Sequence, residues 1–189
     1  MLTIVVPSEE IYDEASNKFI QVKGTTLQLE HSLISISKWE SKWHKIFLDE
    51  QTKRTNDETL DYIKCMTLTP NVDPMVYYIL KADNLKKIND YINNPMSATT
   101  FNEKQLKKMT MGKPKQDEKM SSELIYYWMV AAQIPFECEK WHLNRLLTLI
   151  RICGIKSEPP KKMSRSDVAD KYRNTNAARR AAAAAHRPH

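Results

Sequence analysis

Glycine is scarce in this 189-residue chain, which contains only Gly24, Gly112 and Gly154. Glycine supplies the positive-φ turns and close backbone approaches on which phosphate-cradling loops and catalytic elbows depend. No GxGxxG, GxxxxGK[ST] or GxSxG pattern can be assembled from three isolated glycines. The sequence therefore argues against these nucleotide-binding loops and against a serine-hydrolase elbow, and it favours helices over a large sheet.

The N-terminal segment has the alternation of a β-hairpin. Leu2, Ile4 and Val6 alternate with other residues before Pro7, and the run KFIQVKG is rich in residues that favour strands. The polar stretch between them suits a loop. We therefore predict a short hairpin over about residues 2–23.

Apolar residues three or four positions apart predict a small helical bundle over about residues 32–153. The segment 24–35 fits either a strand or a helix, and we favour an extended entry followed by a helix from about Ser32 to Leu48. Further helices are predicted from Asn56 or Asp57 to Pro70, at 74–81 and 83–93, from Ser121 or Ser122 to Pro135, and at 136–153 with Gly154 as C-cap. Residues 94–120 are the least core-like part and are predicted to be a mobile excursion. The expected fold class is mainly α with a short β-hairpin (α+β).

Charge divides the chain into a neutral body and a basic tail. Residues 1–155 contain 20 Lys+Arg and 20 Asp+Glu, whereas residues 156–189 contain nine basic and three acidic residues, so the net charge of +6 lies in the tail. Pro159 and Pro160 begin a low-complexity, alanine-rich end. We predict a globular body at 1–155 and a disordered basic tail at 156–189, parts of which become helical on binding.

The three cysteines, Cys65, Cys138 and Cys153, form no CxxC pair, which favours a reduced, intracellular protein. The N-terminus lacks the basic and apolar regions of a signal peptide. No apolar stretch approaches the roughly 18 to 20 residues of a membrane span. We expect no membrane association.

The stretch IPFECEKWHLNRLLTLIRICGIK is the strongest candidate for a reactive site, because Cys138 and His142 are four residues apart. Structural zinc needs four ligands, usually in two close pairs, and Cys153 lies eleven residues beyond His142. A Cys–His nucleophile would also need an oriented base and an oxyanion hole. We interpret the stretch as a core helix that carries Cys138 and His142 incidentally. The expectation is a protein without catalytic residues, metal or cofactor.

Aromatic residues are the better candidates for contacts with a partner. Trp39, Trp43 and Phe47 recur every four residues, and Tyr127 and Trp128 lie on a later predicted helix. Core packing explains such a stripe most simply, while a groove for a partner's helix is the alternative.

Arg179 and Arg180 make the tail a candidate site for an acidic partner. Such an arm binds phosphates by counterion release or folds on a protein partner. The tail has no aromatic residue among its arginines apart from Tyr172, which favours a protein over a nucleic acid.

Four stretches carry a resemblance to a known group of proteins. They are TLQLEHSLISISKWESKWHKIFL, ETLDYIKCMTLTPNVDP, SSELIYYWMVAAQIPFECEKWHLNRLLTLIRICGIK and PPKKMS with the later NAARR. Over residues 2–165 and NAARR the chain resembles the tail assembly chaperones of siphophages that infect Gram-positive hosts. The resemblance implies a helical, non-enzymatic protein of the host cell cytoplasm. Such a protein coats the apolar helix of the tape-measure protein until tail-tube subunits displace it.

From the residues and the resemblance together, we expect an assembly chaperone that binds the tape-measure protein, with the tail-tube protein and further copies of itself as other partners. The expected contact residues are Trp39, Trp43, Phe47, Tyr127, Trp128, Arg179 and Arg180. A structural virion component, such as a head–tail connector or tail accessory protein, is the first alternative. A nucleic-acid-binding regulator that acts through the basic arm is the second.

Overall fold

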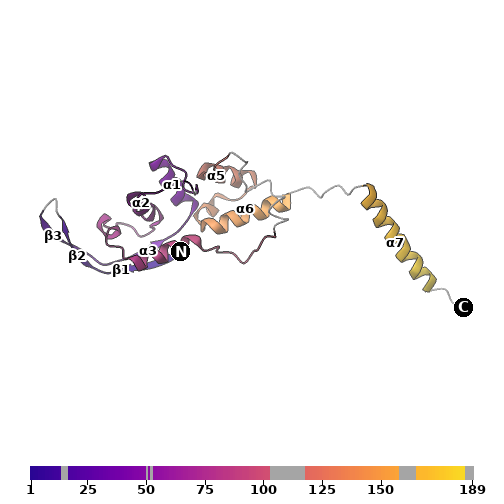
Figure 1. Cartoon of the computed structure of the whole chain (residues 1–189), viewed down its shortest axis with the longest axis horizontal. Coiled ribbons are helices and arrows are strands. Elements are labelled where there is room, and N and C mark those ends of the chain that lie inside the picture. Colours follow the sequence, from indigo (N-terminus) through magenta and orange to yellow (C-terminus); the bar gives the residue numbers. More distant parts are fainter. Residues whose placement is uncertain (14–16, 50, 52, 103–117, 158–164, 186–189) are drawn as a thin grey trace. The chain divides into compact units, whose positions relative to one another are not determined.

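The computed structural model describes residues 1–13, 17–49, 51, 53–102, 118–157 and 165–185 (Figure 1). It confirms the predicted fold class, since the protein is mainly α with an antiparallel β-ribbon at its N-terminus. The centre of the predicted excursion at 94–120 lies outside the described residues.

The chain divides into two compact units, Met1–Ser157 and Glu158–His189. The first contains the ribbon and the helices up to α6, and the second contains α7. No helix among the described residues combines the length and the apolar character needed to cross a membrane.

The ribbon is longer than the predicted hairpin. Strand β1 (Leu2–Val6) pairs with β4 (Thr25–Leu29), and β2 (Glu9–Asp13) pairs with β3 (Lys18–Val22), all in one continuous antiparallel register. The prediction of a loop after Pro7 is wrong for residues 9–13, because Ile11 and Tyr12 find apolar partners opposite them in Ile20 and Phe19.

Pro7 and Gly24 interrupt the ladder where the two halves of the ribbon meet. Proline has no N–H to donate to a strand ladder. A Cβ on Gly24 would lie 2.9 Å from the Ser8 N and 3.2 Å from the Val6 O, closer than a side chain tolerates. A side chain at position 24 therefore fits only if the facing backbone shifts, which favours glycine there.

Two capping boxes begin the first helices. Ser32 caps α1 (Leu33–Trp43) with Ser35, and Thr55 caps α2 (Asn56–Met66) with Glu58. The N-cap of α2 is thus one residue before the predicted pair. The predicted extension of the first helix to Leu48 is wrong, because His44 adopts the left-handed conformation (φ 52°) and ends α1.

The later elements follow the predicted boundaries more closely. They are η1 (Pro74–Tyr77), α3 (Ala82–Asn93), α5 (Ser122–Ala131), η2 (Phe136–Lys140) and α6 (Leu143–Ser157). The single helix predicted at 136–153 is wrong. An extended pair, Trp141 and His142, separates η2 from α6, and Gly154 lies inside α6 instead of capping it.

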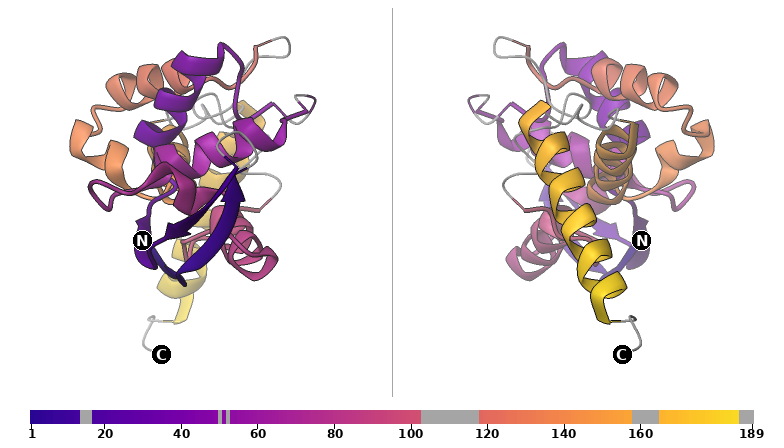
Figure 2. Two further views of the ribbon diagram at one scale, coloured as in Figure 1. Left: turned by 90° about the vertical axis from the view of Figure 1, so that its left-hand side faces the viewer. Right: turned by 90° about the vertical axis from the view of Figure 1, so that its right-hand side faces the viewer.

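Figure 2 shows the ribbon beside the helices of the first unit. One hydrophobic core joins its inner face to these helices. The ribbon contributes Ile4, Val6, Val22, Leu27 and Leu29, and the helices contribute, among others, Leu33, Ile36, Trp39, Ile63, Met66, Ile88, Ile125, Met129, Leu146 and Ile150.

Helix α7 (Arg165–Ala185) occupies most of the tail for which we predicted disorder. Alanine has the highest helix propensity, and the stretch has no proline or glycine to stop a helix before Pro188. Helical propensity therefore decides the local structure here, even though the described side chains of α7 are exposed to solvent.

Candidate partner-binding surface

Three of the predicted aromatic contact residues lie in the core. Trp39, Phe47 and Trp128 are buried, which contradicts the prediction that they anchor a partner. The Trp39 and Phe47 rings meet edge to face with centroids 5.2 Å apart, and the Trp39 Nε1 donates to the Glu58 carbonyl oxygen at 2.8 Å. The regular spacing of Trp39 and Phe47 in the sequence therefore reflects packing in the core.

Trp43 is half-buried against α2. Its Nε1 donates to the Asp61 Oδ2 at 2.9 Å, and the Lys42 Nζ lies 2.5 Å from the Asp61 Oδ1. Partial burial favours the protonated form of Asp61, but the hydrogen bonds from Lys42 and Trp43 outweigh it and hold the pKa of Asp61 below its usual value. The indole edge of Trp43 is therefore occupied within the fold.

Tyr127 is the predicted aromatic residue that remains on the surface, with 65% of its side chain exposed. Val130, one helical turn later on the same face of α5, is 60% exposed. Ile125, Trp128 and Met129 point the other way into the core. Helix α5 therefore presents a second apolar face to solvent.

Glu40 holds the start of α5. This buried carboxylate accepts hydrogen bonds from the backbone N–H groups of Phe47 and Ser122, both at 2.8 Å. The Ser121 side chain accepts from the Leu124 N–H as the N-cap. A negative charge beside the first turn of a helix stabilises its orphan N–H groups, so the orientation of α5 is tied to α1.

The segment after α5 folds back beside it and extends the exposed apolar face. The Ile134 N–H donates to the Met129 carbonyl at 2.9 Å, and the Phe136 ring lies 6.4 Å from the Tyr126 ring. Phe136 is 57% exposed. The Tyr126 hydroxyl donates to the Glu139 carboxylate at 2.8 Å, and desolvation together with this carboxylate raises the pKa of Tyr126.

We name this region the α5–η2 surface and define it by Tyr126, Tyr127, Val130 and Phe136 with the rim carboxylates Glu123, Glu137 and Glu139. Glu123 and Glu137 are exposed. Exposed apolar side chains grouped beside charges are typical of a protein-contact surface. The arrangement can accept an apolar helix whose flanks carry Lys or Arg.

Val130 and Phe136 were not predicted from the sequence. Nearly every residue of α5 after Glu123 is apolar, so the apolar pattern does not separate a core face from a surface face. The sequence signal for Phe136 is Pro135, which follows α5 and precedes η2, so Phe136 does not continue the helix.

Cys138 and His142 are not neighbours on one helix. Cys138 lies in η2, while His142 pairs with Ser32 in an isolated β-bridge, and the Leu143 N–H donates to the His31 carbonyl at 2.7 Å. Within the described ranges, no group of three or more His, Cys, Asp or Glu residues is arranged to hold a metal ion.

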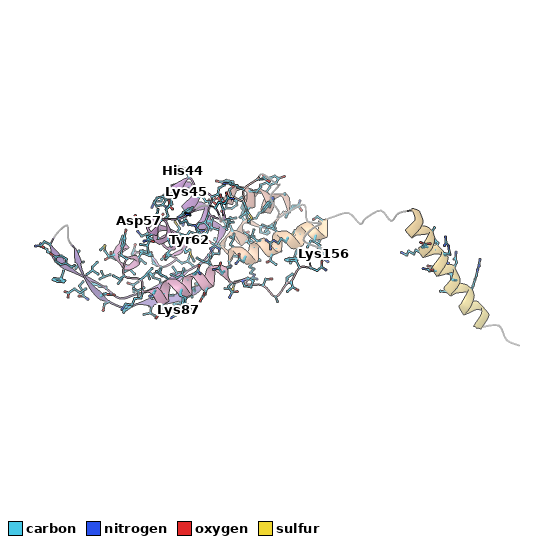
Figure 3. The ribbon with its side chains drawn as sticks, in the orientation of Figure 1. His44, Lys45, Asp57, Tyr62, Lys87 and Lys156 are labelled. Carbon is cyan, nitrogen blue, oxygen red and sulfur yellow. The ribbon has the colours of Figure 1, made fainter. Side chains whose placement is uncertain are left out.

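His142 belongs to a buried polar cluster that is not apparent from the sequence. Its ring lies 5.1 Å from the His31 ring, and its Nε2 lies 3.0 Å from the Tyr91 carbonyl oxygen. The His31 Nδ1 lies 2.5 Å from the hydroxyl of Tyr62, which is labelled in Figure 3. Desolvation, with smaller effects from His142 and Arg54, lowers the pKa of His31 to about 3. The cluster is neutral and internally bonded, which is the signature of a core network.

Arg179 and Arg180 lie on α7 and are exposed, as are Lys171, Tyr172 and Arg173. Arg173 also lies 3.4 Å from Asp170 on the same helix. The second unit thus presents a predominantly basic helix.

No family model, curated protein or solved structure matches this chain.

Proposed function

We propose that this chain is a non-enzymatic assembly chaperone of a tailed phage. It binds the tape-measure protein in the host cytoplasm and keeps it soluble until tail-tube subunits replace it. The observation that carries the proposal is the α5–η2 surface, an exposed apolar strip held rigidly on a folded body.

The chemistry of the α5–η2 surface suits a long apolar helix. Tyr127, Val130 and Phe136 supply contact area that is already exposed, so no unfolding precedes binding. Glu123 and Glu137 favour partners with Lys or Arg beside the apolar stripe and disfavour acidic ones. A small apolar strip gives moderate affinity, which lets tube subunits displace the chaperone later.

Co-expression with the tape-measure protein of the same phage tests the proposal. The expected result is a soluble complex with the wild-type chain and loss of that solubility with Phe136→Ser combined with Tyr127→Ser. Tyr78→Ser is the matched control, because Tyr78 is an aromatic side chain with the same exposed fraction as Phe136, 57%. If the tape-measure protein is no more soluble with the wild-type chain than without it, the proposal is wrong.

Mass spectrometry of purified virions separates the chaperone from a structural virion component. A chaperone leaves during assembly, so its peptides are expected to be missing from mature particles. A constant copy number per particle would identify a connector or tail accessory protein instead.

The basic helix α7 serves a second contact in this proposal, with an acidic protein surface such as that of tail-tube subunits. Its exposed Lys171, Arg173, Arg179 and Arg180 also favour a second candidate function, DNA or RNA binding. Salt-dependent DNA binding that disappears on deletion of residues 156–189 would support the second candidate. No binding at low salt would exclude it.

A further inference from the structure

The distal half of the ribbon, β2 and β3, carries apolar side chains with little protein behind them. Tyr12 and Phe19 are cross-strand partners on one face, with ring centroids 5.1 Å apart and exposed fractions of 50% and 68%. Ile20 is also exposed. Figure 1 shows this half extending past the helices of the first unit. A two-stranded ribbon alone is only marginally stable in water, and added strands stabilise it.

In the proximal half of the ribbon, the outer edge of β4 is paired with another segment of the chain. Beside β4, the Leu68 N–H donates to the Gln28 carbonyl at 2.8 Å, and the Glu30 N–H donates to the Met66 carbonyl at 2.9 Å. An extended stretch around Thr67 therefore closes that edge. β3 lies on the same side of the ribbon as β4. In the described part of the chain, no segment forms backbone hydrogen bonds with the outer edge of β3.

The two edges of the distal ribbon differ in charge. β2 reads EEIYD and carries three acidic residues, whereas β3 reads KFIQV and carries one charge, Lys18. Charged side chains protect an edge from pairing with another strand, so β2 is protected and β3 is not. An antiparallel strand with little charge suits β3 as a partner.

We propose that two copies of this chain join through the outer edges of β3, antiparallel about a two-fold axis, into a four-stranded sheet. The β3 edge is self-complementary. With Phe19 opposite Phe19 of the second copy, the rings of Tyr12, Phe19 and their two counterparts form one row, and Lys18 faces Ile20 of the second copy rather than another charge. The acidic β2 strands then form both outer edges and stop further growth. This inference stands independently of the chaperone function.

Sedimentation velocity of the full chain between about 10 µM and about 1 mM tests the association, because a dimer joined only by two five-residue strands is expected to dissociate in that concentration range. A monomer–dimer equilibrium is expected. Phe19→Lys should raise the dimer dissociation constant by about tenfold or more. Val5→Lys is the matched control, because Val5 lies on the proximal half of the ribbon and is also 68% exposed. Circular dichroism checks that both variants are folded. A monomer at every concentration, or equal effects of the two variants, overturns the proposal.

Cysteine cross-linking identifies the edge. In a background with Cys65 and Cys153 replaced by serine, Phe19→Cys is expected to form a disulfide-linked dimer under mild oxidation, whereas Tyr12→Cys is not. Head-to-tail pairing of β2 with β3 would instead give efficient cross-linking between Tyr12→Cys and Phe19→Cys chains. The mass of the assembly would then keep rising with protein concentration. That result overturns the two-fold arrangement.

Discussion

The carboxylate of Glu40 on α1 accepts a hydrogen bond from the backbone N–H of Ser122, at the start of α5 and 82 residues later in the chain. Its other oxygen accepts from the Phe47 N–H. One buried side chain thus fixes the loop after α1 and the helix that carries the candidate surface.

Glu40→Ala is expected to lower the free energy of unfolding by about 3 kcal/mol, because two buried N–H groups lose their acceptor. Urea unfolding measures the effect. Glu137→Ala, at an exposed carboxylate beside the same helix, is the control and should change stability by less than about 0.5 kcal/mol. Equal losses for the two variants would contradict the role of Glu40.

Tyr127 and Trp128 are adjacent in α5, but Tyr127 is exposed to solvent and Trp128 is buried in the core, so their substitutions should differ in their effect on stability. Trp128→Ala is expected to cost about 3 to 5 kcal/mol of stability, because its buried ring leaves a cavity. Tyr127→Ala should cost about 0.5 kcal/mol or less. Thermal or urea unfolding of both variants checks the prediction, and a large loss for Tyr127→Ala would place that residue in the core.

The buried histidine cluster predicts that the free energy of unfolding decreases as the pH is lowered. The pKa of His31 is about 3 in the folded protein and 6.5 in the unfolded chain, so the unfolded state binds more protons between these values. Stability is therefore complete above pH 6.5 and decreases as the pH falls toward 3, by about 1.4 kcal/mol per pH unit for this one proton. Burial lowers the pKa of His142 as well, which adds in the same direction.

Urea midpoints at pH 7.5, 6 and 5 measure this dependence. His31→Gln should be less stable than wild type at pH 7.5, because the bond with Tyr62 is altered, yet its stability should change less than that of wild type between pH 6 and 5. Parallel pH dependence in both proteins would show that other groups, such as the lysine-paired Glu58 and Asp61, dominate the acid response.

Gly24→Ala is expected to lower stability by about 1 to 3 kcal/mol, because the added methyl group meets the Ser8 N and Val6 O of the opposite strand. Lys23→Ala, at the neighbouring exposed position, is the control. Urea unfolding compares the two, and a neutral Gly24→Ala would show that the ribbon junction can widen without cost.

Local sequence signals were sufficient for the helices whose caps and breakers agree with their apolar spacing. Asp73 before Pro74, Ser121 before α5 and Pro135 after it place three boundaries close to where the structure has them. The ribbon is longer than predicted because Ile11 and Tyr12 lie among acidic residues, and their strand character depends on their partners on β3.

The candidate surface could be predicted only in part, for a physical reason. In α5 both faces are apolar, and the contacts of Glu40 and Met129 decide which face turns inward. The His31–His142 pair is equally invisible in sequence, since it arises when residues more than 100 positions apart meet in one β-bridge.

The bridge between Ser32 and His142 has a consequence for synthesis on the ribosome. At the entry to α1, the backbone pairing of residues 31 and 32 forms only when His142 and Leu143 have left the exit tunnel. The elements α5 and η2, which pack on α1, also lie about 80 or more residues after it, and contacts between such distant segments form slowly. The first unit therefore completes its folding late in translation, when most of its chain is already outside the ribosome and exposed to other proteins of the cell.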